Sequence, residues 1–563
     1  MKSNWIVLAL FLLGFESAFS QSAFIKRQQE DSYLIDRLDI LNGRISDSLF
    51  TSLNPMNSRD VVEFMERYRE EHDSTMTADE KRYIDNYIRQ YAEWSHRGVS
   101  FEPSKKPVLK MLYKNKTNFL HFEKDGNLFV LNPVLAYQQM VETGITNQNL
   151  FLNVRGLEAR GHIRKRIGFY THITEIQERG PQHHQNYVNN FEAVPGNDHY
   201  RRFKIEKPGI ANDYAYASGY IDAEVMKDVI HLTFGQDRFQ YGDGFRSLQL
   251  SDFGANYLFL KANTRIWKVN YQNLFMELLP QSVHYADDSL YPKKYAAMHH
   301  LSINPTKWLN IGVFESIIFA RQNSFALNYL NPVIFYRAVE LYNGSPDNAN
   351  VGLNFKINPG IKTVFYGQFM LDEFRLSRIR GGEKWWGNKY AFQLGAKMAD
   401  PFGIKNMVVQ VEGNLIRPYT YSRDSVSNYT HYNQPLAHPY GANLVEASFI
   451  MRYQPKDKWY ISAKAFYNKQ GRDTASAVSF GGNVFKDYTK RTGEYGIGMF
   501  NGYASRVLFG NINAAYEFRE NLYFDFGLNY RSEKADHPKN PSFRSVQVYT
   551  GFRLNYTRRT YDY

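Results

Sequence analysis

The 563-residue chain contains no cysteine. Disulfides, thiol catalysis and cysteine-ligated metals are therefore excluded, and stability must come from burial and backbone pairing. After residue 20 the sequence also lacks an uncharged apolar run of the ~18 residues that a membrane helix needs. If the mature chain crosses a membrane, it must cross as a closed β-barrel, because only helices and barrels pair every backbone group in lipid.

Charge of one sign is not concentrated in any segment. The formal net charge is +12, but the excess of lysine and arginine is spread along the chain without a long basic block. This distribution gives little support to nucleic-acid binding, so we predict no nucleic-acid partner. It suits contact with anionic polysaccharide or lipopolysaccharide better.

Aromatic residues are abundant. They make up 16% of the chain, with 42 Tyr and 41 Phe, yet the mean hydropathy is −0.51. Transmembrane β-barrels combine these properties, because lipid-facing and lumen-facing residues alternate and aromatic girdles mark both interfaces. A large secreted β-sandwich can show the same composition, so composition leaves both classes open.

Residues 1–20 have the form of a secretory signal peptide. Lys2 gives a basic start, an apolar run extends from Trp5 to Gly14, and small residues precede Gln21. The apolar run is too short to span a bilayer. We therefore predict that the chain is exported.

Residues 21–117 differ from the rest of the chain and predict a small helical domain in the periplasm. Thr77 and Glu80 have the spacing of a capping box, in which a hydroxyl and a carboxylate satisfy free amides at a helix start. Tyr83 and Tyr87 begin an apolar stripe at helical spacing behind it. The domain either packs only against itself, or docks on and partly plugs the mouth of a barrel.

Alternation of apolar and polar residues dominates residues 118–563. It is clearest near the C-terminus, where one set of alternate residues is apolar: Ile512, Ala514, Tyr516 and Phe518, then Leu522, Phe524, Phe526 and Leu528. Short turns alternate with long polar connections, which is typical of outer-membrane barrels with their long loops facing outward. Counting these segments gives roughly 16 to 18 strands. We predict a transmembrane antiparallel β-barrel, of about 18 strands, in the cell outer membrane.

Motifs of catalysis are missing. The sequence has no His-Glu-x-x-His, no Gly-x-Ser-x-Gly and no phosphate-binding glycine loop. We interpret His183–His184 and His299–His300 as ordinary polar side chains. Asp372, Glu373 and Glu412 are expected to form ion pairs inside the lumen, because nothing fixes the separation that a glycosidase pair needs. We predict no enzyme, no catalytic residue, no cofactor and no metal.

A cluster of glycines and charges, Gly235–Gly244, ends a predicted strand. One interpretation is structural, a bulged strand end that folds a loop into the barrel wall. The other is functional, because the cluster could present Asp237, Arg238, Tyr241 and Asp243 to a sugar. Both remain open at this stage.

Planar side chains in the long loops suggest a second binding surface. Trp385 and Trp386 lie between Gly382 and Gly387, and Tyr419 lies in another long connection. Aromatic faces stack on the C–H faces of sugars, while charged groups bond hydroxyls and carboxylates. The alternative is that these residues form an interface girdle or pack loops together.

Several blocks together resemble the Wzi/RemB family of outer-membrane barrels. They are Phe234–Gly244, Asn331–Tyr336, Leu353–Gln368 and Val409–Gly413. The resemblance implies an 18-stranded outer-membrane barrel with a periplasmic helical element. Wzi members hold polysaccharide at the cell surface, and RemB members are linked to gliding motility in Bacteroidetes. Wzi members usually carry tryptophan where this chain has Tyr241.

We therefore predict a non-enzymatic outer-membrane protein that binds or organises surface polysaccharide, as in capsule assembly, and supports gliding motility in the RemB case. The predicted partners are surface or capsular polysaccharide, outer-membrane lipid and lipopolysaccharide, and gliding or surface-assembly proteins. The candidate polysaccharide-binding residues are Asp237, Arg238, Tyr241, Asp243, Trp385, Trp386 and Tyr419. The alternative is a passive porin for small solutes.

Overall fold

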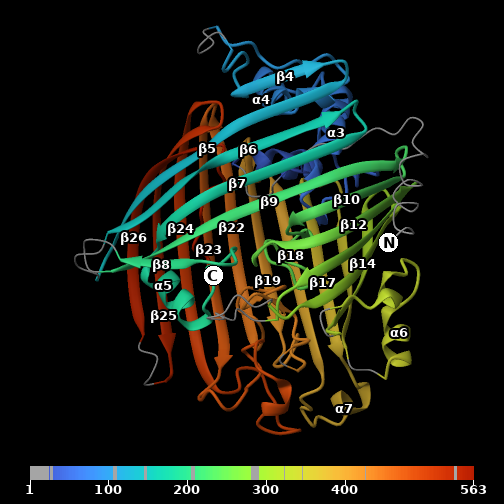
Figure 1. Cartoon of the computed structure of the whole chain (residues 1–563), viewed down its shortest axis with the longest axis vertical. Coiled ribbons are helices and arrows are strands. Elements are labelled where there is room, and N and C mark those ends of the chain that lie inside the picture. The colour runs from blue at the N-terminus through green and yellow to red at the C-terminus, as the bar shows by residue number, and fades with distance from the viewer. Residues whose placement is uncertain are drawn as a thin grey trace, which may run out of the picture.

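The computed structural model describes residues 24–25, 30–105, 111–144, 149–204, 209–280, 291–321, 324–344, 347–424, 426–537 and 542–563 (Figure 1). The predicted signal peptide, residues 1–20, lies outside these ranges. Within them the chain forms a closed antiparallel barrel of 18 strands, as predicted. Each strand pairs with the next along the chain, and the last pairs with the first, Leu554 opposite Leu135.

The wall strands have these bounds: β5 (Asn127–Glu142), β6 (Leu150–Ile163), β7 (Ile167–Arg179), β9 (Ile210–Met226), β10 (Ile230–Asp237), β12 (Tyr257–Ile266), β13 (Val269–Leu278), β14 (Lys294–Thr306), β15 (Leu309–Phe319), β16 (Asn348–Ile357), β17 (Thr363–Glu373), β18 (Lys389–Ala399), β19 (Met407–Ile416), β22 (Leu444–Lys456), β23 (Trp459–Arg472), β24 (Tyr503–Arg519), β25 (Leu522–Ala535) and β26 (Phe543–Leu554). Two short strands extend the wall, β4 (Leu120–Lys124) beside β5 and β8 (Arg201–Lys204) beside β9.

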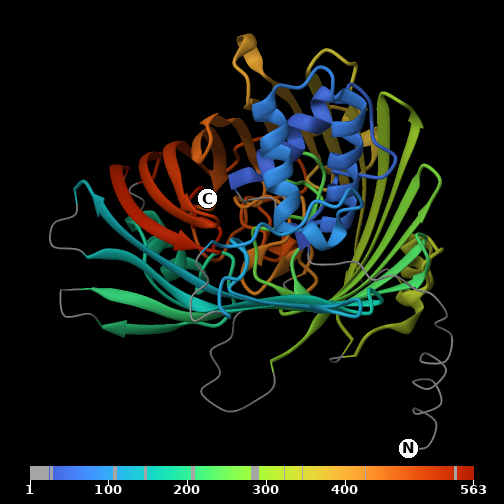
Figure 2. The same ribbon diagram turned by 90° about the horizontal axis from the view of Figure 1, so that it is seen from above.

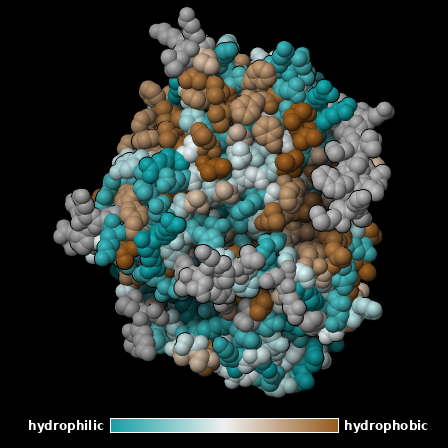
Figure 3. Space-filling view, viewed as in Figure 1, coloured by the Kyte–Doolittle hydropathy of each residue, from teal (hydrophilic) through white to brown (hydrophobic). Residues whose placement is uncertain are grey.

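The predicted alternation sets the two faces of the wall. In β25, Phe524, Phe526 and Leu528 are exposed on the outside, whereas Asp525 and Asn529 are buried in the lumen. An apolar exterior and a polar interior are what a barrel in lipid requires. Figure 3 shows hydrophobic side chains gathered over the wall strands.

The two ends of the barrel differ. Turns of two to seven residues join the strands at one end, as at 164–166, 267–268 and 400–406. Long connections join them at the other end, as at 180–209 and 473–502. Helices interrupt three of the long connections: α5 (Gln182–Phe191), α6 (Tyr336–Tyr342) and α7 (Leu376–Arg380).

The helices before the barrel cover its short-turn mouth (Figure 2). They are α2 (Tyr33–Leu41), α3 (Ser58–His72) and α4 (Ala78–Gln90). The capping box of Thr77 and Glu80 at α4 is present. Their apolar sides form one cluster that includes Val364, Ala399 and Val408 of the wall, so the helices pack on the barrel as well as on each other. None of the described helices is both long and apolar enough to cross a bilayer.

Ion pairs fix this helical region to the wall. Asp36 in α2 lies 2.8 Å from Lys397, and Asp60 in α3 lies 2.7 Å from Arg265. The residues before and after α2 enter the lumen in two small sheets: β1 (Phe24–Ile25) with β3 (Met56–Asn57), and β2 (Leu53–Asn54) with β11 (Gln240–Tyr241). A further small sheet, β20 (Thr430–His431) with β21 (Gln434–Pro435), lies in a long connection.

Candidate functional site in the lumen and the long loops

Residues 238–256, between β10 and β12, turn into the lumen. Gln368 on β17 holds this luminal loop on two sides, donating to the Tyr241 carbonyl at 2.9 Å and accepting from the Leu248 amide at 2.8 Å. Gly242 has φ +100°, and a Cβ there would lie 2.1 Å from the Gln368 amide nitrogen. Glycine is therefore required at this close approach. The structural interpretation of the glycine cluster needs a correction, because the loop fills the lumen and does not join the wall.

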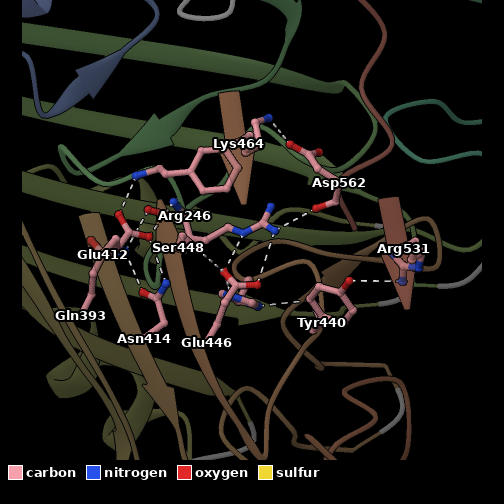
Figure 4. Close-up of polar contacts among 12 residues, drawn as sticks. Arg246, Gln393, Glu412, Asn414, Tyr440, Glu446, Ser448, Lys464, Arg531 and Asp562 are labelled. Atoms are coloured by element: carbon pink, nitrogen blue, oxygen red, sulfur yellow. Dashed lines mark hydrogen bonds and ion pairs between the residues drawn. The ribbon is translucent and has the colours of Figure 1, made fainter. Parts of the chain in front are cut away.

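Arg246 is the centre of a buried polar network in this loop (Figure 4). Its guanidinium donates to Glu446 at 3.0 Å and to the Asp562 carbonyl at 2.8 Å. Its backbone amide, and that of Phe245, donate to the Glu412 carboxylate at 3.0 and 2.6 Å. Wall strands β19 and β22 thus supply two carboxylates that fix the loop across the lumen.

Two of the tentative binding residues are fully enclosed by this packing. Tyr241 is 0% exposed and its ring packs against His300 and Phe314. Asp243 accepts a hydrogen bond from Thr51 at 2.6 Å, and it lies 3.9 Å from Lys356. In this conformation both residues join the loop to the helical region and the wall. Their role in binding sugar stays a prediction.

Asp237 and Arg238 lie beside an internal cavity of about 340 Å³. Arg238 donates to the carbonyls of Gly196 at 3.2 Å and Gly254 at 2.8 Å, which holds it on the cavity wall. Further charged residues around this cavity come from distant parts of the chain: Glu30, Arg452, Lys464 and Arg558. Polar and apolar side chains line this cavity, and its size could take one small solute or sugar unit.

The chain after β26 also enters the lumen, which no sequence pattern indicated. Asp562 pairs with Lys464 on β23, and Arg559 lies 3.1 Å from Glu178 on β7. The Tyr561 hydroxyl also donates to Glu178, at 2.7 Å. This C-terminal segment and the luminal loop together occupy the middle of the barrel.

The C-terminal segment is anchored on two buried histidines of α5. The Nδ1 atom of His184 lies 2.5 Å from the Tyr563 hydroxyl, and His183 lies 2.9 Å from the Tyr561 carbonyl. Burial lowers the pKa of His184 to about 4 from its ordinary 6.5, although the Glu178 carboxylate opposes this change. Burial lowers the pKa of His183 as well. Both rings are therefore neutral at neutral pH.

Acidification is expected to loosen this anchor. A solvated histidine takes up a proton at a higher pH than His184 does in the fold, so the anchor is complete above about pH 6.5 and is lost as the pH falls toward 4. Hydrogen–deuterium exchange of residues 557–563, corrected for intrinsic rates, should rise over this range. A His183→Gln/His184→Gln variant should lose the pH dependence. Constant protection of the wild type down to pH 4 would contradict this.

Trp385, Trp386 and Tyr419 are brought together, but they are not at an exposed tip. Both tryptophans are only 7% exposed. Trp386 stacks on Tyr488 with a 5.1 Å centroid distance, and Tyr419 meets Trp386 edge-on. The partners come from the two following long connections, so the pair packs loops together, which is one of the alternatives that the sequence left open. The exposed tip of this loop is α7 with its flanking basic residues.

The sequence predicts ion pairs of Asp372 and Glu412 with Arg375 or Arg417, but the structure gives these two carboxylates other partners. Asp372 lies 3.1 Å from Lys389, and Glu412 accepts the two loop amides described above. Within the described ranges, no group of three or more histidines and carboxylates could hold a metal ion.

Known structures establish the fold. The chain is similar to Wzi of Escherichia coli, described as an outer membrane protein involved in group 1 capsule assembly and a carbohydrate-binding β-barrel, at 12% identity and TM-score 0.56. That alignment covers 96% of this chain and 100% of Wzi. Weaker matches include OprD of Pseudomonas aeruginosa (9% identity, TM-score 0.39, 76% and 95% covered) and OccAB4 of Acinetobacter baumannii (9%, 0.42, 77% and 98%). No protein-family model and no curated protein matches the chain. The fold is that of an outer-membrane β-barrel.

Proposed function

We propose that this protein is a non-enzymatic outer-membrane protein that binds or organises surface polysaccharide. Its long loops would face outward, and its helical region would lie in the periplasm. The filled lumen carries this proposal, because the luminal loop, the C-terminal segment and the helical region occupy the space that a pore would need. The likeness to Wzi, a carbohydrate-binding barrel, over its full length supports it.

The passive-porin alternative is less favoured. An 18-stranded barrel with an empty lumen would leave an aqueous channel. Here Arg246 of the luminal loop is bound to the wall by the buried carboxylates of Glu412 and Glu446. Breaking buried contacts of this kind costs several kcal/mol, about 3–5 when one partner of a buried ion pair is lost. The cavity beside Asp237 and Arg238 has a volume of about 340 Å³.

The long-loop end offers the surface for an extended polymer. In the loop 374–388, Arg375, Arg380 and Lys384 are exposed, and Trp385 and Trp386 form the packed base beneath them. Guanidinium groups bind the carboxylates and hydroxyls of acidic glycans through charge-assisted hydrogen bonds. We propose that polysaccharide contacts this basic tip first, with the tryptophans and Tyr419 holding its shape. A role in gliding rests on the resemblance to RemB alone.

Polysaccharide retention tests this proposal. Purified protein is immobilised in detergent and exposed to surface polysaccharide extracted from the producing cell. We expect retention by the wild type, a clear loss for Arg375→Ala/Arg380→Ala/Lys384→Ala, and a similar loss for Trp385→Ala/Trp386→Ala. Lys458→Ala, in a turn at the opposite end, is the matched control and should retain polysaccharide normally. No retention by the wild type, or equal retention by all variants, would contradict the proposal.

A further inference from the structure

The connection between β15 and β16 does not extend away from the barrel. Its residues 324–344, here called the flap, lie against the outside of the wall (α6 in Figure 1). His300 on β14 contacts Tyr241 in the lumen, so the adjacent His299 faces outward. Tyr336 of the flap lies on His299, with ring centroids 4.0 Å apart. The Tyr271 hydroxyl on β13 donates to the flap carbonyl of Pro332.

A row of polar side chains lies beneath the flap. Asn273, His299 and Glu315 are direct neighbours across β13, β14 and β15, and all three are buried. The Arg337 amide of the flap donates to Glu315 at 3.0 Å. Without this cover, an ionisable row would face the membrane, where such groups are costly.

On both sides of the flap, at the level of the polar row, the outer face of the wall is apolar and uncovered. Leu260 on β12 pairs with Phe275, which packs under the flap, and Val351 on β16 pairs with Glu315. Both Leu260 and Val351 are exposed. The flap is therefore flanked on both sides by the lipid-facing surface of the barrel.

The outward side of the flap is mostly apolar, although Asn328, Asn331 and Arg337 are also exposed. Leu327, Val333 and Tyr342 are 74%, 84% and 89% exposed. The only charged residues in the flap are Arg337 and Glu340, which pair with each other. By contrast, the loop 374–388 carries five charged residues: Arg375, Arg378, Arg380, Glu383 and Lys384. A loop that faces water can carry many charged side chains, as the loop 374–388 does, whereas the flap carries few.

The flap also satisfies much of its backbone internally, which lipid demands. The amide of Val333 donates to the Asn331 side chain at 3.1 Å. The amides of Ala338, Asn343 and Gly344 donate to flap carbonyls at 3.0 to 3.1 Å.

We infer that the flap is a membrane-contacting element whose outer face binds the acyl chains of the leaflet at the long-loop end. Continuity with the bare wall on both sides favours lipid over a second copy of the chain or another protein. The flap would cover the polar row with an apolar surface, so that Asn273, His299 and Glu315 are shielded from lipid. This inference does not depend on the polysaccharide proposal.

Site-directed spin labelling tests it, and the absence of native cysteine makes single labels specific. Labels are placed at Val333→Cys and Tyr342→Cys on the flap, Leu301→Cys on the bare wall and Arg380→Cys at the basic tip. All four positions are exposed, so labelling disturbs little packing. The protein is reconstituted in phosphatidylcholine vesicles, and collisions with oxygen and with a water-soluble nickel chelate are measured.

We expect both flap labels to match the label at position 301, with strong oxygen collision and loss of nickel collision. The label at position 380 should show the reverse. Flap labels that match position 380 would place the flap in water and overturn the inference. Flap labels shielded from both reagents, with dipolar coupling between chains, would assign the surface to a second copy and also overturn it.

Discussion

Arg246→Met is expected to lower the free energy of unfolding by about 3–5 kcal/mol, the cost of removing one partner of a buried ion pair. The Arg246 and Glu446 side chains are 6% and 0% exposed, so neither is screened by solvent. Methionine fills much of the same volume, but it leaves Glu446 without its guanidinium. The Asp562 carbonyl also loses its donor.

The matched control is Arg246→Met/Glu446→Gln, which removes both charges. It should recover most of the loss, because no uncompensated charge stays buried. Urea titration in detergent, followed by tryptophan fluorescence, compares the wild type with the two variants. If Arg246→Met has the same free energy of unfolding as the wild type, this pair does not hold the luminal loop. The same conclusion follows if Arg246→Met/Glu446→Gln is no more stable than Arg246→Met.

The wall strands could be predicted from the sequence because their physical cause is local. A strand with one face in lipid and one in the lumen must alternate, and β25 does so from Leu522 to Tyr530. The capping box at α4 is equally local, since Thr77 and Glu80 are three residues apart. Short turns and long loops followed from the same pattern.

The contents of the lumen could not be predicted, because their contacts join residues far apart in the chain. Arg246 carries no motif, and its partners Glu412, Glu446 and Asp562 lie 166, 200 and 316 residues away. Gly242 gave a signal that a tight turn was needed, but not which way the loop turns. The burial of Trp385–Trp386 could not be predicted for the same reason, since residues of later loops bury the pair.

The flap has its own signal in the sequence. Asn331–Tyr336 lies in a block that resembles the Wzi/RemB family, but no helical or strand period runs through it. The scarcity of charge over 324–344, compared with the charged loop 374–388, would have set it apart from the water-exposed connections. Composition of each loop, rather than of the whole chain, is the better guide to such elements.

The filled lumen predicts the second large effect, on ion flow. Open 18-stranded barrels conduct because their interior is water. In this barrel the luminal loop pairs with the helical region at Tyr241 and Leu53, and the C-terminal segment crosses to β7 at Glu178. Both obstacles are held by buried polar contacts, so thermal motion should not open a steady path. A variant with residues 239–255 replaced by a short Gly-Ser linker, and with the helical region 21–117 and residues 556–563 removed, should conduct, provided that it folds.

Single-channel recording in planar bilayers tests this most directly. Insertion of the wild type is verified independently by protection of the barrel from protease in vesicles. The structure predicts no steady current from the inserted wild type and discrete open steps from the trimmed variant. Steady, ohmic steps from the wild type would show that the lumen is open and would favour a porin over a polysaccharide-binding barrel.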